Sequence, residues 1–327
     1  MSFSLLLSRD HDGRRLDRTL RSVWPELPLS AIMRALRKGE VRVDSVRVRE
    51  PGSRVHAGQE IYVPWEAPGA RPAVVRHGSV PVLWRSPGSM VVNKPADLLV
   101  QPDVKGGDSV VTRVWSMLEG PSGLPSAEGP GFAPAAVHRL DRNTTGALIV
   151  ALRGDVLRAL ETLFRERRVG KRYLAVVSGR PPEEAEIDAP LLKDAEANRV
   201  QVSPQGKSAL TRCRCLARDG ELALVSLELL TGRTHQARVH MAHIGCPILG
   251  DRKYGDFEAN RRWRTALRRP LLHAFELSFP DGLTSPLEEL AGRAFRAPLP
   301  RDMGSLAEAR GWNLDVLKEE QRWKKRF

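Results

Sequence analysis

The chain has 327 residues, of which 41% are hydrophobic and 28% are charged, so it has room for one large globular domain and a smaller one. It contains no run of about 18 apolar residues, and its first residues lack the basic and apolar regions of a secretion signal. We therefore expect neither a membrane protein nor a secreted one. The net charge is +13, from 52 Lys and Arg against 39 Asp and Glu. This excess favours a nucleic-acid partner, although a generally basic surface would give the same number.

Residues 14–66 predict a small α/β unit that begins with two helices. Apolar residues at helical spacing predict the first helix shortly after residue 14. The second is predicted over residues 30–38, with Ser30 as its N-cap and Gly39 at its end. Its apolar stripe consists of Ile32, Ala35 and Leu36, and the neighbouring face carries Arg34, Arg37 and Lys38.

Short strands are predicted to complete this unit. In "EVRVDSVRV", alternation turns the arginines outward, places a turn at Asp44–Ser45, and points inward the valines Val41, Val43, Val46 and Val48. "HAGQEIYVP" supplies one more strand after a glycine turn.

This order of elements resembles the small RNA-binding module of a ribosomal small-subunit protein and of several RNA-modifying enzymes. The resemblance rests on two short helices, "LRKGEVRVDSVRV" and "AGQEIYVP". It implies that Arg34, Arg37 and Lys38 bind RNA. The alternative is that these three cations form a solvated basic face of the helix and bind nothing.

The composition changes after this unit. Residues 67–79 are rich in Pro and Gly and predict a linker, residues 80–310 predict a second domain, and residues 311–327 form a basic tail. In the second domain the predicted strands outnumber the helices and do not alternate regularly with them. We therefore expect an α+β fold with a mixed, mainly antiparallel β-sheet and flanking helices, rather than a doubly wound fold.

One carboxylate stands between two arginines in "AVHRLDRNTTGALIVAL". Asp141 lies between Arg139 and Arg142, and a buried strand is predicted to follow. Nearby positive charge favours the ionised carboxylate, which can serve as a nucleophile or base. The alternative is a surface ion pair of little energetic consequence. The hydroxyls and glycine of Thr144–Gly146 suit a tight turn next to a ligand.

Five blocks in order resemble the RluA/RluC-type ribosomal RNA pseudouridine synthases. They are "VVNKPADLLVQP", "HRLDRNTTG", "GKRYLAVVSG", "TGRTHQARVHMAHIGCPILGDRKYG" and "LLHAFELSFP". The resemblance implies that Asp141 is catalytic, that Tyr173 lies against the target base, and that Arg233 pairs with the catalytic carboxylate. It also implies that Arg139 enters the RNA where the flipped nucleotide was. Thr145 and Ala237 depart modestly from the family pattern.

The family resemblance implies an enzyme that isomerises uridine to pseudouridine in RNA, with large-subunit ribosomal RNA favoured. The isomerisation conserves atoms and oxidation state, so no cofactor is expected. Sugar attack, base attack and elimination all remain open as routes. The alternatives are a synthase that acts on tRNA and an RNA-binding protein without activity.

Other residues raise alternatives that the sequence disfavours. His235, His240 and His243 lack the spacing of a zinc-binding helix, so we expect no metal and no metal-dependent hydrolase. The three cysteines, Cys213, Cys215 and Cys246, fit no disulfide framework, so we expect reduced thiols and a cytoplasmic location. We also expect a monomer. Arginines and lysines surround tryptophans over residues 260–270 and 318–327, which suits either RNA stacking or a solvated basic helix.

Overall fold

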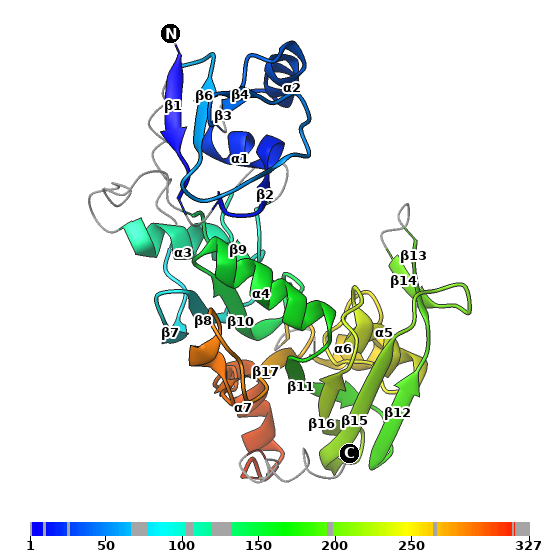
Figure 1. Ribbon diagram of the computed structural model, residues 1–327. Coiled ribbons are helices and arrows are strands. Elements are labelled where there is room, and N and C mark those ends of the chain that lie inside the picture. Colours follow the sequence, from blue (N-terminus) through cyan, green and yellow to red (C-terminus); the bar gives the residue numbers. More distant parts are fainter. Residues whose placement is uncertain are drawn as a thin grey trace.

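A computed structural model of the protein describes residues 2–8, 11–24, 27–66, 78–102, 107–119, 132–194, 199–263, 267–315 and 317. Most of the predicted linker and most of the predicted basic tail lie outside these residues, as does the basic segment 318–327. Figure 1 shows the N-terminal unit at one end of the molecule and the larger β-sheet of the second domain below it.

The N-terminal unit has two helices, α1 (Leu16–Val23) and α2 (Leu29–Lys38), and a four-stranded sheet of order β1-β6-β3-β4 (Figure 1). These strands are β1 (Phe3–Leu6), β3 (Arg42–Val43), β4 (Val46–Arg47) and β6 (Glu60–Val63), and a second pair joins β2 (Arg14–Arg15) to β5 (Arg54–Val55). A shared core that includes Leu20, Leu36 and Ile61 holds the helices on the sheet. Burial of these side chains supplies the main stabilisation of the unit.

Three local expectations for this unit differ from the structure. Strand β1 precedes the predicted start at residue 14, yet it pairs with β6; a four-residue run is too short to be distinguished from a loop by its pattern. Ser30 lies inside α2, whose N-cap is Pro28 in an extended conformation. Val46 is 67% exposed because β4 is the outermost strand of its sheet. The left-handed Gly39, with φ 68°, ends α2 as expected.

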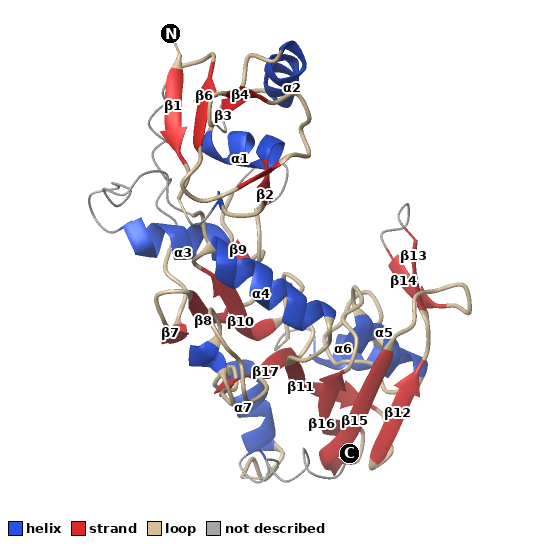
Figure 2. Ribbon diagram, viewed as in Figure 1, coloured by secondary structure: helices blue, strands red, loops and turns tan. Residues whose placement is uncertain are grey.

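The second domain is built on a ten-stranded sheet of order β12-β15-β16-β11-β17-β10-β8-β7, with β18 on β17 and β9 on β10 (Figure 2). The strands are β7 (Val82–Arg85), β8 (Ser89–Lys94), β9 (Ala135–Ala136), β10 (Thr145–Ala151), β11 (Gly170–Ser178), β12 (Glu184–Asp188), β15 (Leu210–Asp219), β16 (Leu222–Leu229), β17 (Leu272–Ser278) and β18 (Ala294–Arg296). The β10–β17 contact is parallel and the other paired strands of this sheet are antiparallel. The expected α+β fold with a mixed, mainly antiparallel sheet is confirmed.

Helices and a hairpin surround this sheet. The helices are α3 (Val110–Glu119), α4 (Gly154–Arg165), α5 (Gln236–His243), α6 (Phe257–Trp263) and α7 (Arg301–Ala309), with a short 3-10 helix at Glu288–Leu290. Strands β13 (Leu191–Asp194) and β14 (Arg199–Val202) form a hairpin that projects beyond the sheet (Figure 2).

Strand β10 is buried along its whole length because helices cover both of its faces. Ile149 packs in one core with residues of α4, whereas Leu148 packs in another with residues of α3 and α5. A strand covered on both sides reads as a continuous apolar run, as "ALIVAL" does. At its start, Gly146 has φ 118°, and a Cβ atom there would lie 2.1 Å from the carbonyl oxygen of Ala274 on β17. The turn that carries Asp141 is thus attached to a tightly packed strand.

Helix α5 starts three residues after the first arginine of "GRTHQARVH". It begins at Gln236, and Arg233, Thr234 and His235 lie in the loop before it. His235 has a left-handed backbone with φ 56°, so the chain changes direction at this residue, between the loop and the helix. The two arginines of "GRTHQARVH" therefore stand on different local structures, with Arg238 on the helix and Arg233 before it.

Candidate active site

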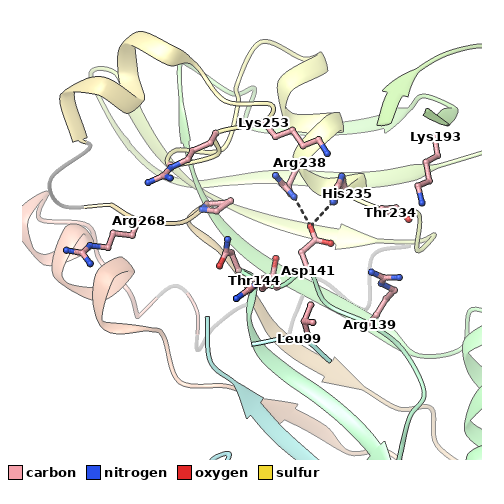
Figure 3. Close-up of a pocket in the computed structure, with 15 residues that line it drawn as sticks. Leu99, Arg139, Asp141, Thr144, Lys193, Thr234, His235, Arg238, Lys253 and Arg268 are labelled. Carbon is pink, nitrogen blue, oxygen red and sulfur yellow. Dashed lines mark hydrogen bonds and ion pairs between the residues drawn. The ribbon is translucent and has the colours of Figure 1, made fainter. Parts of the chain in front are cut away.

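The carboxylate of Asp141 lies in a tight turn between β9 and β10. The amide of Thr144 donates a 3.0 Å hydrogen bond to the carbonyl oxygen of Asp141, and Thr144 and Thr145 are buried beneath the turn. Figure 3 shows Asp141 directed toward the side chains of Arg238 and His235, which come from the α5 region. Two segments far apart in the sequence therefore meet at this carboxylate.

A buried lysine supports the turn from behind. Nζ of Lys94 donates to the carbonyl oxygens of Pro95, Leu98 and Arg142 at 2.8, 2.7 and 2.8 Å, and Lys94 is 0% exposed. Burial lowers the pKa of Lys94 to about 7, even though Asp141 nearby favours the charged form. Because one of the three acceptors belongs to the residue after Asp141, Lys94 ties the turn to the end of β8.

The partner of the Asp141 carboxylate is Arg238. Nη1 of Arg238 donates to Oδ2 of Asp141 at 3.1 Å, while Nε and Nη2 donate to the two oxygens of Asp251 at 2.6 and 2.8 Å. Asp251 is buried and also accepts the backbone amides of Lys253 and Tyr254 at 2.9 and 3.2 Å. A bidentate contact fixes the plane of a guanidinium. Asp251 therefore sets which nitrogen of Arg238 reaches Asp141.

Charge stabilisation within this group is mutual. Burial alone raises the pKa of the Asp251 carboxyl, but the hydrogen bonds from Arg238 and from the backbone outweigh it and hold the pKa below its usual range. Burial disfavours the charged form of Arg238, and the two carboxylates outweigh that effect and raise its pKa. The guanidinium is thus a permanent cation beside Asp141.

The expected pairing of Arg233 with the catalytic carboxylate is wrong. Nε of Arg233 donates to the carbonyl oxygen of Ser208 at 3.0 Å, and Arg238 takes the place beside Asp141. The reason is the start of α5 at Gln236, which separates the two arginines. Of the arginines next to Asp141 in the sequence, Arg142 pairs with Asp97 at 2.8 Å and Arg139 is exposed. Neighbours in the sequence therefore do not supply the ion pair.

His235 and Tyr254 complete the surroundings of Asp141. Nδ1 of His235 is 2.8 Å from the hydroxyl of Tyr254, and its Nε2 is 3.9 Å from Oδ2 of Asp141. Burial lowers the pKa of His235, against the opposing influence of Asp141. The guanidinium of Arg238 lies 5.0 Å from the centre of the Tyr254 ring, a cation–π distance. Tyr254 therefore packs against the arginine and orients the histidine.

Asp141 stands at the junction of two cavities, of about 450 Å³ and 510 Å³. Both are lined by Arg139, Asp141, Thr234 and His235. The first is also lined by Arg252 and by three cations labelled in Figure 3, Lys193, Lys253 and Arg268. The second contains Tyr173 and Arg233, so Asp141 shares this cavity with the two residues that the family resemblance places beside it. Positive walls around one carboxylate are suited to a polyanion that must approach it.

Tyr173 is a neutral, buried side chain in this second cavity. It is 8% exposed, and burial, followed by the charge of Asp141, raises the pKa of its hydroxyl above the usual range. The hydroxyl therefore stays protonated at physiological pH. Its ring forms part of the cavity wall beside Asp141.

The remaining expected residues lie elsewhere. Arg34, Arg37 and Lys38 are exposed on α2 of the N-terminal unit. His240 is buried, with its ring nitrogens 2.9 Å from the hydroxyl of Thr211 and the carbonyl oxygen of Ala189. Among the described residues, no group of three His, Cys, Asp or Glu side chains could hold a metal ion. In the same part of the chain, no helix is long and apolar enough to cross a bilayer.

Comparison with known proteins identifies the family of the chain. A family model described as RNA pseudouridylate synthase matches residues 89–243. An uncharacterized RNA pseudouridine synthase of Chloroflexus aurantiacus is 37% identical over 296 residues, which cover 89% of this chain and 88% of that protein. The chain belongs to the RNA pseudouridine synthase family.

Relatives of this synthase include ribosomal large subunit pseudouridine synthase C of Escherichia coli, 34% identical over 91% of this chain and 92% of the relative. Synthase D of Haemophilus ducreyi is 30% identical over 98% of both chains. Among solved structures, human RNA pseudouridylate synthase domain containing 4 matches with a TM-score of 0.55 and 27% identity, over 70% of this chain and 93% of that one. The family resemblance of the five sequence blocks is thereby confirmed.

Three residues that surround Asp141 in the structure were not predicted from the sequence blocks. Arg238 is the second arginine of "GRTHQARVH", and Asp251 and Tyr254 belong to "PILGDRKYG". The spacing of the two arginines in "GRTHQARVH" could have indicated Arg238, because Gln236–His243 is helical and Arg238 is on its first turn. No spacing rule joins Asp251 to Arg238, because the contact depends on the turn after α5.

Proposed function

We propose that this synthase isomerises uridine to pseudouridine in large-subunit ribosomal RNA, with Asp141 as the catalytic carboxylate. The observation that carries the proposal is the ion pair of Asp141 with Arg238 at the junction of two positively lined cavities. A carboxylate fixed and kept charged in this way is suited to a sugar or base that becomes electron-poor. The names of the relatives support ribosomal RNA as the substrate class.

The reaction breaks the bond between N1 of uracil and C1′ of ribose and forms a bond from C5 to C1′. The proton on C5 leaves and N1 gains a proton, so atoms and electrons balance without an oxidant. Cleavage of a glycosidic bond develops positive charge on the sugar, which the carboxylate of Asp141 stabilises or captures. Sugar attack, base attack and elimination all place this carboxylate against the extruded nucleotide.

The target uridine has to leave its stack before it reaches Asp141. Extrusion costs a few kcal/mol, and protein groups that fill the space left behind offset that cost. Arg139 is exposed and lines both cavities beside Asp141, so its guanidinium is available to stack on bases and pair with phosphate. The ring of Tyr173 provides a flat wall for the flipped uracil.

Other groups contribute binding rather than chemistry. Exposed Arg34, Arg37 and Lys38 on α2 bind RNA phosphates through the N-terminal unit. Arg233 acts as a cation in the wall of the second cavity. This assignment includes a cytoplasmic monomer that uses neither cofactor nor metal.

Replacement of Asp141 by Asn tests the proposal. The amide keeps the size of the side chain and removes its charge, so we expect pseudouridine formation in a large-subunit ribosomal RNA transcript to fall by about three orders of magnitude or more. RNA affinity, measured separately by filter binding, is expected to change much less. Wild-type activity in D141N would overturn the catalytic role. Pseudouridine formed in tRNA transcripts, and none in ribosomal RNA, would overturn the substrate class.

A further inference from the structure

The second cavity contains more positive charge than the pairing of Asp141 requires. It lies between the end of α4 and the loop before α5, and its charged lining consists of Arg139, Asp141, Arg165, Arg167, Lys171 and Arg233. Asp141 is the one carboxylate among its described lining residues. We refer to it as the lysine cavity, after Lys171 at the start of β11. Because five cations and one carboxylate line it, the cavity has an excess of positive charge that can bind another negative group.

Lys171 is one of the less exposed of these cations. It is partly buried, and its Nζ donates to the carbonyl oxygen of Thr231 at 3.3 Å. An ammonium has three N–H donors. Thr231 is the one acceptor that Lys171 contacts at hydrogen-bond distance in the described part of the chain, which leaves donor capacity directed toward the cavity. Burial lowers the pKa of Lys171 to about 8, and an anion bound in the cavity would stabilise its protonated form and raise that pKa again.

Arg167 occupies a backbone position that favours glycine. Helix α4 ends in a Schellman motif, in which the amides of Arg167 and Arg168 donate to the carbonyl oxygens of Phe164 and Leu163 at 3.2 and 3.0 Å. The left-handed residue of that motif is usually glycine, and here it is Arg167, with φ 58°. A side chain that lines a cavity from an unfavourable backbone conformation indicates a functional use.

A nearby histidine adds no charge to the lysine cavity. His138 stacks on Phe164 with ring centres 4.7 Å apart, and its Nε2 accepts the amide of Ile149. Burial, followed by the charge of Lys171, lowers the pKa of His138 to about 3, so it remains neutral. The cavity therefore has an uncharged wall, formed by the stacked rings of His138 and Phe164, next to its cationic side chains. Such a combination suits the sugar and the phosphate of a nucleotide.

We propose that the lysine cavity binds the phosphodiester next to the target nucleotide, with Lys171 and Arg167 as its ligands. This inference rests on the proposed function, because it assumes an RNA chain that passes Asp141. One nucleotide enters the junction beside the carboxylate, and the neighbouring phosphate lies between Lys171 and Arg167. The two cations then fix the register of the RNA relative to Asp141.

The first experiment removes one negative charge at a time from the RNA. A short RNA that contains the target uridine is made with a single neutral methylphosphonate at each of the four nearest linkages, and its affinity for wild type and for Lys171→Met is measured. We expect one linkage at which the neutral group costs wild type about tenfold in Kd and costs K171M little. Additive effects at every linkage would overturn the proposal. Inorganic phosphate should displace the RNA with the neutral group at that linkage less effectively than the others. Equal displacement of all these RNAs by inorganic phosphate would also overturn the proposal.

The second experiment uses the backbone of Arg167. Arg167→Gly relieves the left-handed conformation, so the melting temperature should rise by about 1 °C or more while RNA affinity falls severalfold. Arg168→Ala is the matched control, because it removes the same charge one residue away, where Arg168 is paired with Glu166. A loss of affinity in R168A equal to that in R167G would show a general charge effect and overturn the site.

These outcomes are separable from failure of the proposed function. If wild type forms no pseudouridine in any ribosomal or transfer RNA, the proposed function fails. If wild type forms pseudouridine and neither K171M nor R167G alters Kd or the linkage profile, the proposed function stands and the phosphate site is wrong.

Discussion

Nη1 of Arg238 lies 3.1 Å from Oδ2 of Asp141, and this contact joins the start of α5 to the turn before β10. The rest of the guanidinium is held by Asp251. One cation thus serves two carboxylates of different exposure, since Asp251 is fully buried and Asp141 borders the cavities. The buried carboxylate fixes the position of Arg238, and the accessible one is the carboxylate that we propose to be catalytic.

Lysine at position 238 should abolish most activity. Lys has one charged centre and cannot maintain the bidentate contact with Asp251 while it reaches Asp141. We expect Arg238→Lys to lower single-turnover pseudouridine formation at least about 100-fold. Arg233→Lys is the comparison, because Arg233 contacts the carbonyl oxygen of Ser208 rather than Asp141, and a loss below about tenfold is expected. An equal loss in both variants would contradict the assignment of Arg238 as the partner.

Replacing Asp251 by Asn should lower both stability and activity. An amide brings N–H donors against the N–H donors of Arg238 and leaves that buried guanidinium with one carboxylate fewer. We expect the free energy of unfolding in urea to fall by about 3 kcal/mol and the rate of pseudouridine formation to fall about 10- to 100-fold. The matched control is Asp97→Asn, an exposed carboxylate paired with Arg142, which should cost at most about 1 kcal/mol. A stable, fully active D251N would show that Arg238 is positioned by other groups.

Lys94 should make stability increase with pH just above neutrality. Its pKa is about 7 in the folded protein and near 10.5 when unfolded, so the unfolded chain binds more protons between these values. Lys94 therefore raises the free energy of unfolding between about pH 7.5 and 8.5 by up to about 1.4 kcal/mol per pH unit, and Lys171, whose pKa burial lowers to about 8, adds to this rise. Above about pH 9 the buried thiol of Cys213, with a pKa of about 12, opposes this trend.

Lys94→Met provides the test of that contribution. The variant leaves three buried carbonyl oxygens without their donor, so it should lose about 3 kcal/mol or more of stability at pH 8. It should also lose much of the rise between pH 7.5 and 8.5 in urea titrations. The same slope in wild type and variant would mean that another group causes it.

RNA affinity should fall as pH rises through the pKa of Lys171. That pKa is about 8 in the free protein, and phosphate binding requires the charged form, so affinity should drop by about tenfold between pH 7 and 9. Lys171→Arg retains the charge and should remove this drop. The charged groups that act on Lys171 are Arg167, which lowers its pKa, and Glu228, which raises it, while the nearby His138 is neutral. The comparison is made by filter binding on one RNA, and parallel pH profiles for wild type and K171R would contradict the prediction.

Several features of the fold and site were determined by local sequence. The apolar run after Gly146 specified a strand buried on both faces, and Gly39 specified the end of α2, because these signals act over neighbouring residues. The five ordered blocks specified the family, and in the structure Asp141 and Tyr173 line one cavity. Strand β1 and the N-cap of α2 were not predicted, since a short edge strand and an extended proline carry weak local signals.

Only the tertiary structure decided which cation faces the carboxylate of Asp141. In the sequence Asp141 has arginines at positions 139 and 142, and the family block offers both Arg233 and Arg238. The choice depends on where α5 begins and on the turn that brings Asp251 against it, which are long-range packing relationships. Sequence thus determined the types of chemical group present. The folded chain decided their pairing, because electrostatic contacts act through distance and orientation rather than through position along the chain.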